Sequence, residues 1–303
     1  MLFKKQADPI NSSGHELISV SLKTLIDLAK PATSLNLHHL SIRSRQSGGY
    51  VSRFKGRGME FDEARLYQPG DDIRSIDWRV TARTGKTHTK VYREERERPV
   101  FISVDNRLAM NFATRGVFKS VLAAKLAGLL AWAAKYHGDR IGGQLFSEHE
   151  CRELKPQNGR HAVLRFLNAL VKSQNPIDKE FTLDQVLARL NQHARPGSLV
   201  YIISDFRGIN DQAEAHIAKL SQHCEVVLIF IYDPLESSLP TKGRYRFTDD
   251  ERDVVIDTGD KHRLLSYQQR FVQRLQQLEL LAKKRNLAFI QCSTVEDPIQ
   301  CLR

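Results

Sequence analysis

Residues 100–112 read VFISVDNRLAMNF, and this stretch decides the fold. Its first five residues, VFISV, form a mainly apolar run, which is typical of a strand buried on both faces of a parallel sheet. The run ends in Asp105, and a second such run, SLVYIIS at residues 198–204, is followed by Asp205. Because ligands of open parallel α/β sheets collect at the carboxyl ends of the strands, these aspartates are the first candidates for a functional site.

Strands and helices alternate along the chain from residue 99 onward. Further strands are expected at residues 140–147, 151–155, 224–232 and 287–293, and helices at residues 118–136, 160–172, 183–192, 211–222 and 262–285. A β-like excursion at residues 245–258 precedes the last helix. The pattern predicts an α/β fold with a mostly parallel sheet and helices on both of its faces.

The same pattern divides the chain into three segments. Residues 1–40 form an N-terminal helical arm, in which apolar residues at helical spacing are followed by the helix-stopping Pro31. Residues 41–98 are an arginine-rich extension with β character, and residues 87–92 alternate as in a strand. Residues 99–303 are the α/β domain.

The chain of 303 residues is basic, with a formal net charge of +11 and a sequence pI near 9.5. Such an excess favours an acidic partner, which could be nucleic acid, an anionic membrane surface or an acidic protein. Two stretches of the extension, residues 51–58 and 83–90, carry basic residues without acidic neighbours. Their candidate surface residues are Arg53, Lys55, Arg57, Arg83 and Lys86.

Elsewhere in the extension, acidic residues accompany the basic ones. This mixture favours an internal ion-pair network over a nucleic-acid surface, which would need clustered cations and stacking aromatic side chains. Asp71 and Asp72 could suggest a catalytic carboxylate pair, but they follow Pro69-Gly70, which favours a turn or a helix cap. No P-loop motif occurs, so the chain is not itself a P-loop ATPase.

The cysteines and the apolar stretches indicate the cellular compartment of the protein. The four cysteines form no C-x-x-C motif, and their sparse spacing fits a reducing cytoplasm. The N-terminus has no apolar core of signal-peptide length. The most apolar stretch, from Val121, is interrupted by Lys125 and falls short of the roughly 20 residues that span a bilayer. We therefore expect a buried helix there and a cytoplasmic protein.

Several long motifs resemble the DUF58 family of bacterial proteins. They lie at residues 56–86 (GRGMEFDEARLYQPGDDIRSIDWRVTARTGK), 95–105 (ERERPVFISVD), 138–147 (GDRIGGQLFS) and 231–250 (IYDPLESSLPTKGRYRFTDD). The resemblance runs from about residue 50 to the C-terminus. It implies a von Willebrand factor A-like (vWA), Rossmann-like domain and a MoxR-type AAA+ ATPase as partner.

The vWA domain often carries a metal-ion-dependent adhesion site, which the resemblance carries over residue by residue. Its first and last aspartates correspond to Asp105 and Asp205, whereas its two serine positions fall on Arg107 and Ala109. The loop that should supply a threonine is expected near residues 159–161, which contain none. Two carboxylates therefore remain and three hydroxyl ligands are lost.

Arg107 changes the electrostatics of such a site. Two carboxylates completed by waters would bind Mg²⁺ only weakly, because Mg²⁺ demands near-octahedral oxygen ligation. The planar guanidinium of Arg107 could instead bridge Asp105 and Asp205 as a built-in counter-charge. Two alternatives stay open: Arg107 faces solvent, or the two aspartates only cap helices or order turns.

We therefore expect a non-enzymatic interaction module without a cofactor or a tightly held metal. It would serve a MoxR-type ATPase and its client proteins as an adaptor in protein maturation or stress response, and a peripheral association with membrane proteins stays open. The contact face would combine the basic loops with the strand tips, at Asp105, Arg107, Ala109, Ser204 and Asp205. Two alternatives remain: a nucleic-acid-binding protein, supported by charge alone, and a metal-dependent hydrolase that uses Asp105 and Asp205.

Overall fold

The computed structural model describes residues 16–35, 37, 59–94, 97–172, 181–238, 243–248, 253–257 and 261–303. The chain divides into two compact units: residues 44–97 form one, and residues 1–43 together with residues 98–303 form the other. The sequence sets residues 1–40 apart as an arm, whereas the structure counts the N-terminal helices as part of the α/β unit.

The α/β unit is built on a six-stranded sheet with the strand order β5-β4-β3-β6-β7-β10. The strands are β3 (Pro99–Asp105), β4 (Arg140–Phe146), β5 (Cys151–Gln157), β6 (Leu199–Ser204), β7 (Glu225–Tyr232) and β10 (Ala288–Ser293). Neighbours pair in parallel except at the edge, where β5 runs antiparallel to β4. Counted along the chain, the order is the 3-2-1-4-5-6 order of doubly wound folds, which confirms the predicted fold class.

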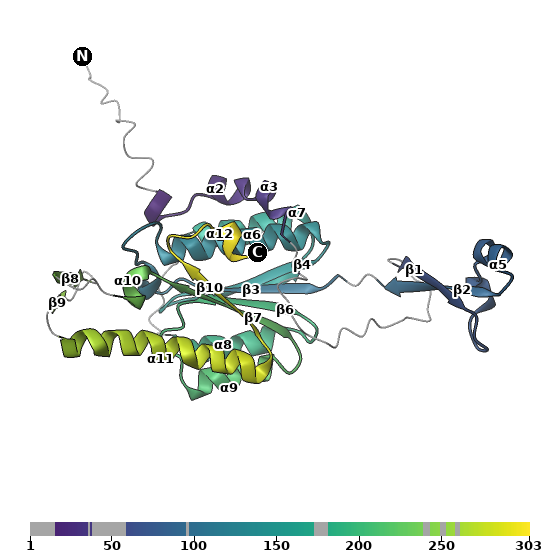
Figure 1. The fold of residues 1–303 in the computed structure, drawn as a ribbon. Helices are drawn as coiled ribbons and strands as arrows, with labels where there is room; N and C mark the ends of the chain where they lie inside the picture. The colour runs from purple at the N-terminus through teal and green to yellow at the C-terminus, as the bar shows by residue number, and fades with distance from the viewer. Residues whose placement is uncertain are drawn as a thin grey trace, which may run out of the picture. The chain divides into compact units, whose positions relative to one another are not determined.

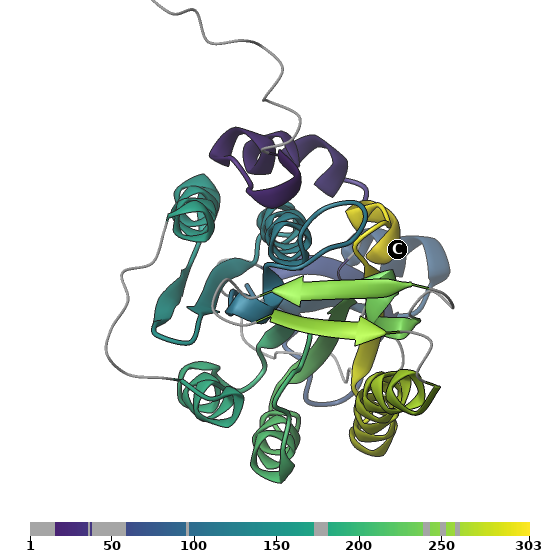
Figure 2. The same cartoon turned by 90° about the vertical axis from the view of Figure 1, so that its left-hand side faces the viewer.

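Helices cover both faces of this sheet (Figure 1, Figure 2). One face packs against α6 (Lys119–Tyr136) and α7 (Gly159–Val171), and the other against α8 (Leu183–His193), α9 (Asp211–Leu220) and α11 (Lys261–Arg285). Alternate residues of each strand point to opposite faces. In β3, Val100, Ile102 and Val104 therefore join the core under α6, while Phe101 joins the core on the other face.

The predicted apolar helix is α6, which is buried along almost its whole length. Trp132 donates its indole N–H to the carbonyl oxygen of Leu25 over 3.0 Å, which ties α6 to the N-terminal helix α2 (Leu22–Asp27). Among the residues that the structure describes, no helix is both long and apolar enough to cross a bilayer.

The N-terminal helices differ from the prediction at one residue. Pro31 was expected to stop the helix, but it lies inside the short helix α3 (Ala29–Ala32), and the break falls at Leu28 instead. Proline is tolerated there because the N–H groups of a first helical turn have no partner within the helix.

Shorter elements complete the α/β unit. Helix α10 (Pro234–Ser237) follows β7, and helix α12 (Pro298–Cys301) follows β10. Strands β8 (Arg244–Thr248) and β9 (Asp253–Asp257) pair antiparallel, as the β-like pattern of residues 245–258 predicts. A single 3-10 turn, η3 (Leu108–Met110), follows β3.

The second unit contains an antiparallel pair, β1 (Met59–Leu66) and β2 (His88–Glu94), together with the 3-10 turn η2 (Ile73–Ser75) and helix α5 (Trp78–Thr84). The side chain of Asp72 caps η2, and that of Asp71 accepts a hydrogen bond from the backbone N–H of Gln68. Arg65 and Asp71 form an ion pair at 2.7 Å. The acidic residues thus shape turns, as the sequence predicts.

Candidate functional site

Asp105 and Asp205 lie at the point where the sheet changes its winding direction. Strands β3 and β6 are parallel neighbours, and Val104 is paired with Ile203, so the residues that follow both strands come together. From β3 the chain moves toward β4, whereas from β6 it moves toward β7 on the other side. Such a switch point is where open α/β sheets bind ligands. Both aspartates are completely buried there.

Arg107 turns back over the two carboxylates instead of facing solvent. Its Nε lies 3.0 and 3.1 Å from the two carboxylate oxygens of Asp105, and its Nη2 donates to Oδ2 of Asp105 over 2.7 Å. The same Nη2 lies 3.7 Å from Oδ1 of Asp205. Only 12 % of the Arg107 side chain is exposed. The guanidinium therefore lies between the two aspartates, in the geometry that a built-in counter-charge requires.

The remaining residues of the predicted site play unequal parts. The Ser204 hydroxyl donates to Oδ2 of Asp105 over 2.5 Å and accepts the backbone N–H of Phe206. Ala109 lies half-buried in η3 and offers only a methyl group. Ser204 therefore helps to hold Asp105 in place, while Ala109 supplies no ligand.

A buried lysine completes the site, and the sequence analysis missed it. Lys119, in the first turn of α6, has no exposed surface, and its Nζ donates to Oδ2 of Asp205 over 2.8 Å and to Oε1 of Glu236 over 2.9 Å. Arg207 forms ion pairs with the same two acids. The signal was a lysine in the first turn of a mainly apolar helix, where a cation opposes the helix dipole. The partner acid, Glu236, lies in the motif at residues 231–250, which the sequence analysis did not connect with the strand tips.

We call this set the strand-tip cluster: Asp105, Arg107, Lys119, Asp205, Arg207 and Glu236. Three carboxylates face three cations, so the formal charges cancel. Burial raises the pKa of Asp105, and the nearby carboxylate of Asp205 adds to the rise, although Arg107 counteracts both. Burial also opposes ionisation of Asp205, but the charge and hydrogen bond of Lys119 outweigh it and lower the pKa of Asp205. A neutral set of this kind is stable in the interior only while all its members remain.

The residues present do not fit a divalent metal ion. Each carboxylate oxygen of Asp105 already accepts from Arg107, and those of Asp205 accept from Lys119 and the Arg207 backbone N–H. A cation would have to displace these donors and would be repelled by two guanidinium groups and an ammonium group. Within the described ranges, no group of three histidine, cysteine or acidic side chains is placed to hold a metal.

The loop expected to match the threonine position lies elsewhere. Residues 159–161 follow β5, whose last residue, Gln157, pairs with Ile141 near the beginning of β4. Because β5 runs antiparallel to β4, this loop lies near the amino-terminal ends of the parallel strands, whereas Asp105 lies at the carboxyl end of β3. The chain returns to the strand tips before α8, where the backbone N–H of Phe181 donates to the carbonyl oxygen of Glu148.

Another buried carboxylate, outside the strand-tip cluster, joins the ends of neighbouring strands. Asp233, at the end of β7, accepts hydrogen bonds from the backbone N–H and hydroxyl of Thr114, from the hydroxyl of Thr294 and from the backbone N–H of Leu235. Burial opposes ionisation of Asp233, but these hydrogen bonds outweigh it and lower the pKa of the carboxyl group.

The lowered pKa of Asp233 predicts a pH dependence of stability. The ionised Asp233 should stabilise the folded protein fully above the pKa of this carboxyl group in the unfolded chain, which is about 4. The stabilisation should be lost as the pH falls through the lower pKa that the group has in the folded protein. Urea unfolding of the wild type and of Asp233→Asn should therefore show a stability gap that narrows on acidification. A gap that stays constant from neutral pH to about pH 2 would contradict the lowered pKa.

Gly116 contacts Thr294, which also binds Asp233, so closely that a single added methyl group should disturb the packing. It has φ +76°, and a Cβ at this position would lie 2.1 Å from the carbonyl oxygen of Thr294. We expect Gly116→Ala to lower the free energy of unfolding by more than about 2 kcal/mol, measured by urea denaturation. Gly138→Ala is the matched control, because Gly138 has φ +79° and no atom near the added methyl group. Equal losses of unfolding free energy in the two variants would mean that the close contact with Thr294 does not destabilise Gly116→Ala.

The predicted basic surface is only partly described. Arg83 and Lys86 are exposed at the end of α5 and just after it. Arg53, Lys55 and Arg57 lie outside the described residues.

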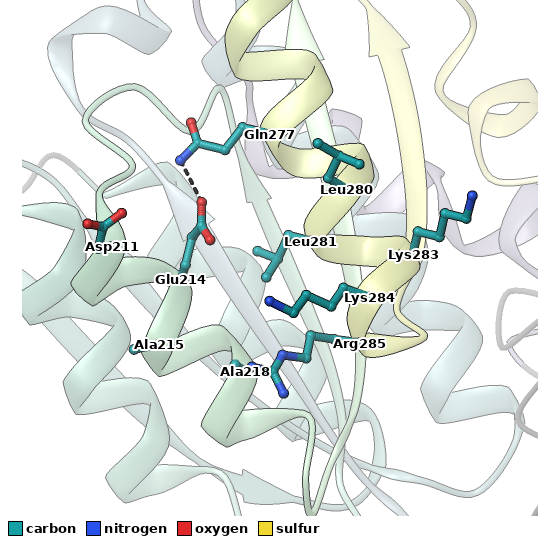
Figure 3. A pocket seen from close by; sticks show the side chains of 10 residues that line it. All are labelled: Asp211, Glu214, Ala215, Ala218, Gln277, Leu280, Leu281, Lys283, Lys284 and Arg285. Atoms are coloured by element: carbon teal, nitrogen blue, oxygen red, sulfur yellow. Dashed lines mark hydrogen bonds between the residues drawn. The ribbon is translucent and has the colours of Figure 1, made fainter.

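A cleft lies apart from the strand-tip cluster. It has a volume of about 820 Å³ and runs between α9 and the C-terminal half of α11 (Figure 3). Ala215, Ala218 and Leu281 line it together with the cations Lys283 and Lys284. None of its lining residues belongs to the cluster.

Comparison with known proteins places the chain in a family. Uncharacterized proteins of Mycobacterium bovis (Mb1516) and Mycobacterium tuberculosis (Rv1480) are each 30% identical to it over 237 residues, which is 76% of this chain and 74% of theirs. Similar solved structures include an aerotolerance-related membrane protein from Bacteroides fragilis (17% identity, TM-score 0.44, 68% of this chain and 94% of that one). A von Willebrand factor type A protein from Catenulispora acidiphila is also similar (10% identity, TM-score 0.34, 48% of this chain and 35% of that one).

The family model described as "Protein of unknown function DUF58" matches residues 63–276, which include all of the strand-tip cluster. The chain therefore belongs to the DUF58 family, and its α/β unit has the doubly wound fold that the family resemblance implies.

Proposed function

We propose that this protein is a non-enzymatic interaction module and acts as an adaptor of a MoxR-type AAA+ ATPase, to which it presents client proteins. Family and fold together support the interaction module, while the ATPase and the clients are the finer part of the proposal. The binding face lies at the carboxyl ends of the strands, where η3 directly follows Arg107 of the cluster.

The observation that carries the proposal is the neutralisation of the cluster by its own side chains. A hydrolase would need Asp105 or Asp205 free to hold a metal or to take a proton from water, whereas both are occupied by internal cations. Arg107 also donates from Nη1 to the carbonyl oxygen of Arg207, so it joins the loops after β3 and β6. The cluster therefore favours a rigid platform over a reaction centre.

The platform presents an apolar side chain to solvent. Leu108 follows Arg107 directly and is 58% exposed, and its backbone N–H is fixed by the carboxylate of Glu148 over 2.8 Å. An exposed leucine on a fixed turn suits a protein partner, because contacts on pre-ordered groups cost little conformational entropy on binding.

Binding to the ATPase tests this face directly. Leu108→Ala should weaken the affinity for a purified MoxR-type ATPase of the same organism by about 10-fold, measured by biolayer interferometry. Leu280→Ala is the matched control, because Leu280 is 66% exposed but lines the cleft of Figure 3. An unchanged affinity in Leu108→Ala would remove the strand-tip face from the proposal, and a loss only in Leu280→Ala would move the interface to the cleft.

A further inference from the structure

The cleft between α9 and α11 combines an apolar hollow with an apolar side chain that projects into solvent. Two alanines of α9, Ala215 and Ala218, and the buried Leu281 of α11 line the cleft (Figure 3). Leu280 lines it as well, but this leucine is 66% exposed. Exposed apolar surface of this kind, with polar residues around it, marks an interaction site. The cleft therefore offers a partner both a hollow to fill and a leucine to cover.

The same cleft is acidic at one end and basic at the other. The helices run in the same direction, because α9 leads into β7 and α11 leads into the parallel strand β10. Asp211 and Glu214 lie in the first turn of α9, and Nε2 of Gln277 in α11 donates to Glu214 over 2.6 Å. Lys284 and Arg285 lie in the last turn of α11 and extend toward α9 at the other end (Figure 3). Each charge lies where the dipole of its own helix favours it, so the polarity of the cleft is fixed.

We propose that this cleft is a dimer interface and that the α9–α11 face of a second copy of the chain occupies it. A two-fold axis through the centre of the cleft, at right angles to both helices, makes the helices of the two copies antiparallel. The acidic end of each copy then meets the basic end of the other, and this contact occurs twice. Leu280 lies between Gln277 and Lys284 in α11, so each copy can place this leucine in the alanine-lined hollow of the other.

The charge pattern is what selects a second copy as the occupant. A nucleic acid or a uniformly acidic peptide would match only the basic end of the cleft and would be repelled at Asp211 and Glu214. A surface with one acidic and one basic end is instead complementary to itself under a two-fold rotation. The interface leaves the strand-tip cluster free, because none of the residues that line the cleft belongs to it. Self-association can therefore be measured without an ATPase, and its outcome is independent of the proposed function.

Sedimentation equilibrium of the full chain tests the dimer. The wild type should be dimeric at micromolar concentrations, and Leu280→Asp should raise the dissociation constant of the dimer by about 100-fold, because a two-fold interface loses this contact twice. Val295→Asp is the matched control, because Val295 is 53% exposed but lies outside the cleft, and it should dimerise like the wild type. A wild type that stays monomeric at about 100 times micromolar concentration would overturn the proposal.

Charge reversal tests whether the acidic end of one copy meets the basic end of the other. Lys284→Glu/Arg285→Glu makes both ends of the cleft acidic, and Asp211→Lys/Glu214→Lys makes both ends basic. Each variant alone should be monomeric at concentrations where the wild type is a dimer, because like charges then meet. An equimolar mixture of the two should form a heterodimer, because every acidic end again faces a basic one.

A control and a folding measurement keep the charge reversal decisive. Arg152→Glu/Arg160→Glu reverses the same number of charges on exposed residues outside the cleft and should dimerise like the wild type. Circular dichroism checks that each variant is folded. If both cleft variants are folded and their mixture stays monomeric, or if either of them dimerises alone like the wild type, the two-fold interface is wrong. Leu280→Asp tests the same interface without changing either charged end.

Discussion

Lys119→Met is expected to lower the free energy of unfolding by about 3–5 kcal/mol, because it leaves the buried carboxylates of Asp205 and Glu236 without the ammonium group that both contact. Methionine keeps most of the side-chain volume, so lost packing should contribute little. Urea denaturation followed by circular dichroism measures the change.

The same helix supplies a matched control for Lys119. Lys125 is half-buried in α6, and Lys125→Met should change the stability by less than about 0.5 kcal/mol. The double variant Lys119→Met/Glu236→Gln should be more stable than the sum of the single losses predicts, because it removes a cation together with an anion. Additive losses would show that Lys119 and Glu236 are not coupled, and the cluster would then be no charge-balanced unit.

Arg107→Ser is expected to have two opposite effects, one without and one with a divalent ion. Without the ion, the substitution should lower the free energy of unfolding by about 3–5 kcal/mol, because buried Asp105 loses its bidentate partner. The serine also places a hydroxyl beside the two carboxylates, and the guanidinium no longer repels a cation. Mg²⁺ at about 100 times its dissociation constant should then raise the free energy of unfolding of the variant by about 2.7 kcal/mol.

The wild type should respond differently to the ion. Its melting temperature should not change with Mg²⁺, and titration calorimetry should detect no micromolar binding of Mg²⁺ or Mn²⁺. Arg115→Ser is the control, because Arg115 is exposed in the stretch between η3 and α6 and should respond to Mg²⁺ like the wild type. Micromolar binding by the wild type would contradict the role of Arg107 as an internal counter-charge.

Much of the architecture follows from local patterns. Runs such as residues 100–104 and 199–204 are too apolar for any place but a sheet covered on both faces, and helices between them require parallel crossovers. Both aspartates were therefore placed correctly at strand tips, because the end of an apolar run is visible in the sequence. Local rules failed at Pro31, where the position within a helical turn decides whether proline is tolerated.

The partners of the strand tips were not predictable in the same way. Lys119 and Glu236 lie more than a hundred residues apart in the chain, and only the folded chain brings the first turn of α6 and helix α10 together. The loop expected to supply a threonine lies at the opposite ends of the strands from Asp105. The sequence did not show this, because nothing local indicates that β5 is antiparallel.

The sequence by itself determined the fold class and the strand tips that carry Asp105 and Asp205. These follow from periodicity and from residue identity, which are local properties. That Arg107 and Ala109 stand where hydroxyl ligands are expected is what the family resemblance implies. Only the tertiary structure decided that Arg107 turns inward and that Lys119 lies between Asp205 and Glu236. The reason is electrostatic: a charge can be buried only where opposite charges from distant segments meet it, and only the folded chain brings those segments together.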